Sequence, residues 1–342
     1  MKAFVYHGDK NFSLENVPMP GAGPGEAVAK IRAASICGTD LRTFRNGSAK
    51  LKTPITIGHE ACCEIVEAGE GADLKNGGRY IIAPAIGCGT CKSCRKGRTN
   101  MCASLQTIGF QFDGTFAEYI KIPRIAVERG HLIPVPDSVS DVAASVVEPV
   151  ACAVNAQNYL QIAPDDNVLI YGSGYLGCMH AELAKVQGAR RVIIAEISEK
   201  RRAQASAFVP DAVVLDSMEG DFLGQVKQAA PEGVDVVITA CPAGVTHKQG
   251  LEVLGQNGRI SLFGGLAGES SGFLDSNLIH YKELCVYGAH ASTAAQNREV
   301  LGAVAQGKLN VEKYVSAFAL AEADKAFDSL IREEATKAVL IP

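Results

Sequence analysis

Four cysteines form the densest group of reactive side chains in the sequence. Cys88, Cys91, Cys94 and Cys102 are spaced Cys-x2-Cys-x2-Cys-x7-Cys, in a stretch that is rich in Gly, Lys and Arg and lacks the apolar periodicity of a core segment. Zinc in structural sites is tetrahedral and takes four thiolates readily, which leaves no position for water or substrate. The spacing therefore predicts a structural zinc site that stabilises the chain, rather than four separate core cysteines.

A second set of residues has the chemistry of a catalytic metal site. Cys37 lies in the sequence SICGTD, His59 and Glu60 lie in IGHE, and Glu148 lies in VVEPV. A catalytic zinc commonly takes three protein ligands and keeps a fourth position for water or substrate. Taken singly, a cysteine is more often buried and inert, and a glutamate before proline more often begins a helix. The hypothesis therefore rests on the joint occurrence of these residues with the four-cysteine group and with the glycine loop described next.

The stretch 167–177, NVLIYGSGYLG, has the spacing of a dinucleotide-binding loop. Gly172, Gly174 and Gly177 follow a buried strand and precede a helical stretch, and Glu196 closes the next strand 19 residues after Gly177. The first glycine permits a tight turn, the second lets the backbone approach a pyrophosphate, and the third allows close packing of helix and strand. The N-terminus of the helix then offers unpaired N–H groups to the phosphates.

Glu196 also bears on the choice of cofactor. A carboxylate at this position can accept both hydroxyls of the adenosine ribose and would repel a 2′-phosphate, which favours NAD over NADP. The basic run 200–202, which includes Arg201, weakens this preference, although such a run is more often a solvated helix face. Tyr175 and Leu176 stand between the second and third glycines and complete the predicted cofactor-binding set, where Tyr175 would either cover the cofactor or pack on the sheet.

The elements that must position these residues fall into two parts. Up to about residue 150, short strands are broken by turns rich in glycine and proline, which predicts a mainly β, barrel-like unit. From 151 to 290, apolar β-branched runs alternate with helical stretches, as in a parallel sheet covered by helices. The expected strands are 2–6, 27–35, 62–69, 79–83 and 116–122 in the first part and 168–171, 192–195, 212–215, 234–239 and 260–263 in the second. The sequence thus predicts an α/β protein with a doubly wound parallel sheet, and periodicity alone does not place the last segment, which ends in KAVLIP.

Length, composition and charge exclude several classes of protein. A chain of 342 residues exceeds the size at which single cores stop growing, and 47% hydrophobic with 20% charged residues is ordinary for a globular protein. A formal net charge of −4 argues against nucleic-acid binding, which usually needs a basic face. The sequence shows neither a secretory signal nor an apolar run long enough to cross a bilayer. We therefore expect a cytoplasmic protein with reduced cysteines and without nucleic-acid or membrane partners.

Taken together, these motifs resemble those of the zinc-dependent medium-chain dehydrogenase/reductase superfamily, in particular its bacterial polyol and threonine dehydrogenase-like branch. The resemblance runs from end to end and rests on Cys-Gly-Thr-Asp at 37–40, Gly58-His59-Glu60, the four-cysteine group, Glu148-Pro149, and the glycine loop with its downstream acid. It implies a GroES-like catalytic domain at residues 1–150, completed by 291–342, and a Rossmann NAD-binding domain at 151–290. It also implies a homodimer or homotetramer joined through the sheet domain.

The resemblance also implies roles for individual residues. Cys37 and His59 would bind the catalytic zinc together with a carboxylate, for which Glu148 ranks first and Glu60 second, with Cys152 a distant third. Thr39 would be the first proton acceptor, because a hydroxyl can donate and accept at once. The implied cofactors are two zinc ions per subunit and NAD.

The implied reaction is the reversible oxidation of a secondary alcohol, of polyol or sugar-alcohol type, to a ketone with hydride transfer to NAD. Many relatives carry His where this chain has Arg42. Arg42 and Arg45 could therefore grip a substrate phosphate or carboxylate, while surface positions for one or both are the competing interpretation. A threonine-type or phosphorylated-polyol dehydrogenase is one alternative, and a non-catalytic NAD-binding sensor is another, although the retained zinc-ligand residues argue against the sensor.

Overall fold

The computed structural model describes residues 1–266, 268 and 270–342, and these divide into two compact units. The first, unit 1, consists of Met1–Ala151 and Ala291–Pro342. The second, unit 2, consists of Cys152–His290. Among the described helices, none has both the length and the apolar run that are needed to span a lipid bilayer.

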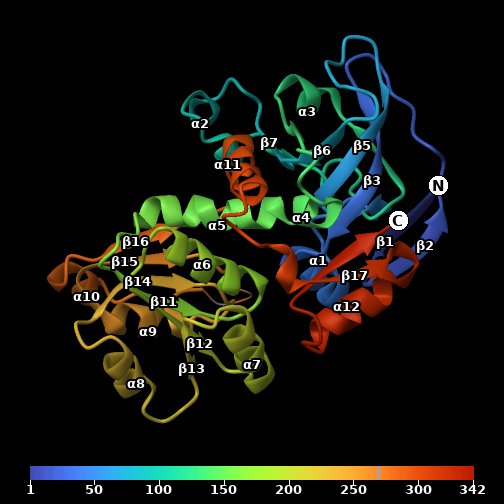
Figure 1. Cartoon of the computed structure of the whole chain (residues 1–342). Helices are drawn as coiled ribbons and strands as arrows, with labels where there is room; N and C mark the ends of the chain where they lie inside the picture. The colour runs from blue at the N-terminus through green and yellow to red at the C-terminus, as the bar shows by residue number, and fades with distance from the viewer. Residues whose placement is uncertain (267, 269) are drawn as a thin grey trace. The chain divides into compact units, whose positions relative to one another are not determined.

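Unit 1 is built mainly from antiparallel strands (Figure 1). Its strands are β1 (Lys2–Gly8), β2 (Asn11–Asn16), β3 (Ala27–Ser35), β4 (Ile55–Thr56), β5 (Glu60–Ala68), β6 (Arg79–Ile82), β7 (Ala85–Ile86), β8 (Gln106–Thr107), β9 (Tyr119–Ile122), β10 (Leu132–Pro134), β17 (Val315–Ala319) and β18 (Lys337–Ile341). A large sheet has the order β10-β6-β5-β3-β18-β17, with β9 also on β3. Smaller sheets have the orders β2-β1-β4 and β7-β8. This β-rich unit agrees with the expected barrel-like first part.

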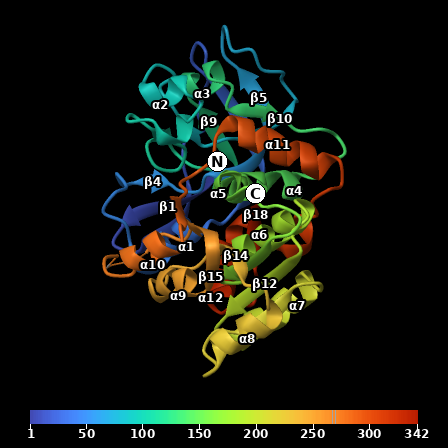
Figure 2. The same cartoon turned by 90° about the vertical axis from the view of Figure 1, so that its left-hand side faces the viewer.

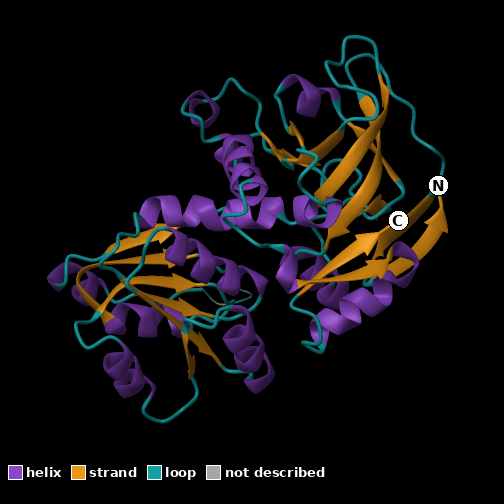
Figure 3. Ribbon diagram, viewed as in Figure 1, coloured by secondary structure: helices purple, strands orange, loops and turns teal. Residues whose placement is uncertain are grey.

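Helices pack on the strands of unit 1 and are drawn in purple in Figure 3. In unit 1 they are α1 (Gly38–Asn46), α2 (Lys92–Arg95), α3 (Arg124–Glu128), α4 (Asp141–Ser145), α11 (Ala294–Ala305) and α12 (Ala323–Ile331), with 3-10 turns η1 (Thr99–Met101), η2 (Glu312–Tyr314) and η3 (Leu320–Glu322). Helix α5 (Val147–Leu160) begins in unit 1 and ends in unit 2. The fully buried ring of Phe327 on α12 stacks on Phe44 of α1, with ring centroids 4.4 Å apart. This packing anchors α1, which carries the residues that follow Cys37.

The C-terminal strand β18 is placed by its pairing with β3, near the start of the chain. Strand β18 runs antiparallel to β3, with Val339 opposite Ser35, and it is parallel to β17. The amide of Ile36 donates to the carbonyl of Ala338 at 2.9 Å. The segment that periodicity could not place therefore completes the sheet that leads to Cys37.

Unit 2 is a parallel sheet with helices packed on it. Its strands are β11 (Asn167–Tyr171), β12 (Arg191–Glu196), β13 (Val213–Asp216), β14 (Val234–Thr239), β15 (Leu254–Leu262) and β16 (Cys285–Gly288). Its helices are α6 (Tyr175–Val186), α7 (Glu199–Phe208), α8 (Phe222–Ala229), α9 (Val245–Val253) and α10 (Ser276–Tyr281). The strand order in the sheet is β13-β12-β11-β14-β15-β16. From β11 the chain first adds strands on one side and then returns to add β14 on the other. Rossmann sheets bind dinucleotides at this switch point between β11 and β14. The predicted doubly wound sheet is confirmed, and Figure 2 shows α9 and α10 side by side within this unit.

Several strand predictions were incomplete. The strands β2, β4, β7, β8, β10, β16 and β17 were not predicted, and β15 begins at Leu254 rather than at residue 260. The additional part of β15 reads LGQNG, in which Asn257 has a positive φ of 58° and the pairing with β14 shifts register. Such a polar, glycine-rich stretch has the local signature of a turn, so only its tertiary neighbours make it part of a strand.

Candidate functional site

The four predicted structural-zinc cysteines lie together in unit 1. Their sulfur atoms are all within 4.8 Å of one another, with Cys94 and Cys102 buried and Cys88 and Cys91 half-buried. Strands β7 and β8 pair on either side of the segment and bring its ends together. Backbone amides of Cys88 and Ser104 donate to the Cys102 sulfur at 3.3 Å. The arrangement offers four soft donors at one point, which fits a structural zinc ion.

The electrostatics of this group differ from one sulfur to the next. A hydrogen bond with the Thr90 hydroxyl, together with backbone amides, lowers the pKa of Cys88 to about 5. Burial raises the pKa of Cys94 to about 12. Zinc binds thiolates and not thiols. A bound ion would therefore have to stabilise the buried thiolate of Cys94, whereas a pKa of about 5 leaves Cys88 largely ionised at neutral pH.

Cys37, His59 and Glu60 form a second group in unit 1, because β3 and β5 are paired. Ser35 at the end of β3 lies opposite Glu60 at the start of β5. Cys37 follows two residues after Ser35 as the N-cap of α1. The ligand atoms of Cys37, His59 and Glu60 all lie within 4.8 Å of one another. Sulfur, nitrogen and oxygen donors from three residues are the set expected of a catalytic zinc.

Charged neighbours set the state of His59. Its Nδ1 lies 3.6 Å from Oδ1 of Asp40, whose other oxygen accepts the backbone N–H of Cys37 at 2.9 Å. Burial opposes a charge on the imidazole, but Asp40, Cys37 and Glu60 together raise the pKa of His59 well above its ordinary value. Because a metal binds neutral imidazole, zinc binding here would release a proton.

Glu60 is fully buried and is held by only one of its oxygens. Its Oε2 accepts from Lys337 Nζ at 2.5 Å and from the Ser35 hydroxyl, and Lys337 also donates to the carbonyl of Ile36 at 2.8 Å. Glu60 Oε1 and His59 Nδ1 are buried without a hydrogen-bond partner among the described residues. Buried polar atoms normally have partners. Nδ1 of His59 faces Asp40, so the orphaned atom that fits a metal ion beside the cysteine sulfur is Oε1 of Glu60.

Glu148, the carboxylate ranked first from the sequence, is not in this group of mutually close donors among the described residues. It lies buried in the first turn of α5, and its Oε1 accepts from the Ser292 hydroxyl at 3.5 Å. Cys152 is half-buried and belongs to unit 2. The choice of the third ligand stays a prediction, with the geometry favouring Glu60.

The remaining predicted residues of α1 divide between its two faces. Thr39 is half-buried in the first turn, two residues after Cys37. Arg42 and Arg45 are exposed, whereas Asp40 and Thr43 form the buried face of the same helix. A substrate role for the two arginines stays a prediction.

Lys337 was not identified from the sequence as part of this site. Its ion pair with Glu60 gives a prediction about stability. Replacing Lys337 by Met would leave Glu60 as a buried charge without its cation. Removing one partner of a buried pair typically costs about 3–5 kcal/mol. Urea unfolding should show a loss of this size for Lys337→Met, with part of it recovered in the double variant Lys337→Met/Glu60→Gln.

The exposed pair of Lys325 with Glu322 offers a matched control. Lys325→Met should cost no more than about 1 kcal/mol, because exposed pairs contribute little. Equal losses of unfolding free energy for Lys337→Met and Lys325→Met would show that the buried pair stabilises the fold no more than an exposed pair does.

The glycine loop of unit 2 has the geometry of a phosphate cradle. Gly172 has a φ of 95°, and a Cβ at Gly177 would lie 2.0 Å from the Gly172 carbonyl oxygen, so neither position accepts another residue without movement. At Gly174, which caps α6, a Cβ would meet only Nη1 of Arg201, at 3.7 Å. The loop and the N-terminus of α6 thus leave backbone N–H groups available to a pyrophosphate, with the Arg201 guanidinium beside them.

Tyr175 is buried and Leu176 is half-buried at the start of α6. The burial of Tyr175 agrees with packing on the sheet rather than with covering a cofactor.

The carboxylate of Glu196 accepts several hydrogen bonds from the protein that the sequence did not indicate. Its Oε2 accepts from the backbone N–H of Ser173 at 2.8 Å and from the Ser173 hydroxyl at 3.1 Å, and Oε1 accepts from the amides of Ile197 and Ser198 at 2.8 and 3.0 Å. A carboxylate has about four acceptor sites. Ribose hydroxyls would therefore have to replace or share these bonds, so the ribose role stays a prediction. Arg202 is not a free surface cation, since it pairs with Asp216 at 2.9 Å.

Comparisons with known proteins match both units. The family model described as alcohol dehydrogenase GroES-like domain matches residues 23–137, and the one described as zinc-binding dehydrogenase matches residues 176–306.

Individual relatives match over nearly the whole chain. The chain is 30% identical to the sorbitol dehydrogenase of Halalkalibacterium halodurans, with 100% of this chain and 99% of the relative covered. It is 34% identical to the L-threonine 3-dehydrogenase of Pyrococcus furiosus, with 91% and 92% covered. Its fold is similar to a crystal structure from Sinorhizobium meliloti 1021, described as a zinc-binding dehydrogenase bound to NADP, with a TM-score of 0.90, 30% identity, and coverage of 100% and 99%.

Proposed function

The chain belongs to the zinc-dependent medium-chain alcohol dehydrogenase superfamily, and we propose that it reversibly oxidises a secondary alcohol of polyol or sugar-alcohol type to a ketone, with hydride transfer to NAD. It is an NAD(P)-dependent zinc-type dehydrogenase with a GroES-like domain and a Rossmann domain. The observation that carries the proposal is the meeting of Cys37, His59 and Glu60 donors in unit 1. We assign substrate chemistry to unit 1 and NAD binding to unit 2.

The proposed chemistry divides among named residues. Zinc held by Cys37, His59 and Glu60 would supply Lewis-acid polarisation of the substrate hydroxyl. Asp40 holds the imidazole of His59 from the side of Nδ1. Thr39 accepts the hydroxyl proton and passes its own proton on, since one hydroxyl can do both. NAD held by unit 2 would accept the hydride from the carbon that bears the hydroxyl, so that alcohol and NAD would give ketone, NADH and a proton.

A substrate panel tests this proposal. NADH absorbance would be followed with the zinc-loaded protein against neutral polyols, phosphorylated polyols and L-threonine. We expect turnover with neutral polyols. Turnover restricted to anionic substrates and lost in Arg42→Gln or Arg45→Gln would instead support the phosphorylated-polyol alternative, and turnover restricted to L-threonine the threonine-type alternative. If NAD bound but no substrate gave NADH, the proposal would be wrong and the sensor alternative favoured.

We also propose that Glu196 makes NAD the preferred cofactor. The variant Glu196→Gln removes the negative charge but keeps an acceptor for the Ser173 amide. Because a like charge near a 2′-phosphate costs on the order of 1 kcal/mol or more, the ratio of kcat/KM for NADP to that for NAD should rise roughly tenfold. The exposed carboxylate of Glu199 provides the control, since Glu199→Gln should leave the ratio unchanged. An unchanged ratio in Glu196→Gln would contradict the charge argument.

For location and assembly we propose a cytoplasmic homodimer or homotetramer joined through unit 2. Strand β16 is an edge of the parallel sheet, and Cys285 on it and Tyr281 just before it are exposed. An unpaired strand edge is a ready template for another chain. Gel filtration with light scattering would contradict the proposal by giving the mass of one chain.

A further inference from the structure

A loop at residues 109–116 packs against the segment that leads to His59. Its backbone amides donate to the carbonyl oxygens of the residues just before His59, and these bonds run from Gly114 to Thr56 at 2.7 Å, from Phe116 to Ile57 at 3.1 Å and from Thr115 to Gly58 at 3.1 Å. The loop follows β8 directly, at the exit of the four-cysteine segment. It therefore fixes the backbone of 56–58 from a part of the chain that supplies no metal ligand to the second group.

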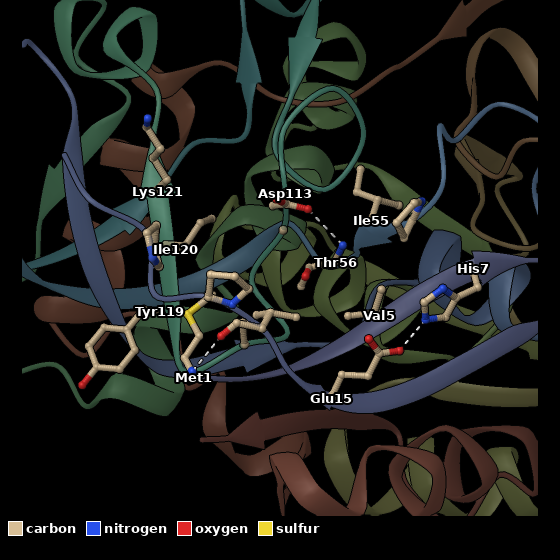
Figure 4. Close-up of a pocket in the computed structure, with 16 residues that line it drawn as sticks. Met1, Val5, His7, Glu15, Ile55, Thr56, Asp113, Tyr119, Ile120 and Lys121 are labelled. Carbon is tan, nitrogen blue, oxygen red and sulfur yellow. Dashed lines mark hydrogen bonds and ion pairs between the residues drawn. The ribbon is translucent and has the colours of Figure 1, made fainter. Parts of the chain in front are cut away.

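Side chains of the same loop add contacts. Oδ1 of Asp113 accepts the backbone N–H of Thr56 at 3.1 Å, and Figure 4 shows these two residues pointing toward one another with Ile55 beside them. The ring of Phe110 lies against the imidazole of His59, with centroids 5.7 Å apart and planes inclined by 54°. With Asp40 beside Nδ1, the imidazole therefore has contacts with both α1 and the loop.

Glycines allow the two backbones to meet this closely. A Cβ at Gly114 would lie 2.3 Å from the carbonyl oxygen of Gly58 and 2.4 Å from that of Ile57, and a Cβ at Gly109 would lie 2.4 Å from the Gly58 oxygen. At Gly58, whose φ is 94°, a Cβ would lie 2.5 Å from the ring of Phe116. Because the atoms met at Gly114 are backbone, they cannot rotate away. Any side chain at Gly114 must therefore move one of the two backbones and disturb the contact between the loop and the segment that ends at His59.

We propose that the loop 109–116 is a positioning element for the catalytic metal, which sets the backbone and ring orientation of His59 so that its donor nitrogen meets Cys37 and Glu60. This inference rests on the proposed function in one respect, that His59 binds the metal. Groups that orient a metal ligand from outside its coordination shell typically change metal affinity by about 10- to 100-fold when they are altered. Functional sites generally need their donors held within about 0.5 Å, and relieving a contact of 2.3 Å between the Gly114 Cβ and the Gly58 oxygen requires a relative shift larger than that tolerance.

The test uses Gly114→Ala in the full chain and Co²⁺ as the probe. Apoprotein would be titrated with Co²⁺ in competition with a chelator, and the visible absorption bands of the bound cobalt would be recorded. We expect the affinity of the Cys37 site to fall about 10- to 100-fold, with altered cobalt bands, while the four-cysteine site keeps its wild-type spectrum. The matched control is Gly21→Ala, since Gly21 lies in unit 1, is exposed, has no left-handed φ and would have no atom within 4 Å of an added Cβ. This control should match the wild type.

A second variant covers the case in which Gly114→Ala does not fold. Asp113→Ala removes only an exposed carboxylate and its bond to the Thr56 amide, so the fold should persist while cobalt affinity at the Cys37 site falls in the same direction. Wild-type affinity and bands in both variants, or in Asp113→Ala alone if the other is unfolded, would overturn the inference. If the wild type itself bound cobalt only at the four cysteines, the proposed function would fail instead.

Discussion

Replacing Cys37 by Ala is expected to abolish alcohol oxidation and to lower the zinc content from about two ions to about one per chain. Cys37 offers the single sulfur donor of its group, and its neighbours there are one imidazole and one carboxylate. A site reduced to two donors holds zinc poorly, since catalytic zinc sites normally use three protein ligands. Loss of several kcal/mol of Lewis-acid stabilisation corresponds to a fall in kcat/KM of at least about a thousandfold.

The measurement pairs NADH absorbance with elemental analysis of the purified variant. Lys325→Met is a suitable control, because that side chain is exposed in unit 1 and is in neither group of metal donors. A Cys37→Ala variant that kept both its zinc and its turnover would exclude Cys37 as a ligand. The same assays on Glu60→Gln and Glu148→Gln separate the two carboxylates, because only the true ligand should lose zinc.

The four-cysteine site and the cofactor loop were predictable as candidates because their signals are local, whereas the Cys37 site was a candidate only because its residues occur together with these two motifs. The four cysteines and the three glycines each lie within a short stretch, and their function depends on that spacing. The parallel strands were predictable for a similar reason, since burial on both faces requires apolar runs such as VDVVIT in β14. For each local motif, both the type of ligand and the neighbouring strand or helix could therefore be predicted from the sequence.

The supporting contacts were not predictable because they join residues far apart in the chain. Lys337 meets Glu60 across 277 positions, and nothing in KAVLIP distinguishes this lysine from one on a surface. Phe110 reaches His59 through the fold of the loop 109–116 and not through spacing. The ranking of Glu148 above Glu60 came from resemblance alone, whereas the pairing of β3 with β5 brings Glu60 to Cys37. Such contacts depend on the register between paired strands, and this register cannot be read from a single sequence.

Unit 1 holds both metal groups, and the chain connects them. The four-cysteine segment enters through β7 and leaves through β8, which are paired, and β8 leads into the loop that bonds to residues 56–58. A change that frees the segment from its zinc should therefore also loosen the end of β8. The two groups differ in chemistry, but we expect the position of the second to depend on the integrity of the first.

Replacing Cys94 by Ser should accordingly reduce both stability and turnover. Structural zinc contributes roughly 10–16 kcal/mol in zinc-finger peptides, which is comparable to the whole stability of a typical domain, about 5–15 kcal/mol, so the segment 87–104 should unfold locally. Hydrogen exchange should show lost protection there and across 109–116, together with one fewer zinc and a lower Tm. Lys92→Ala, an exposed change on the same helix, should match the wild type. Lost zinc with unchanged protection across 109–116 would mean that the loop holds His59 independently of the cysteine segment.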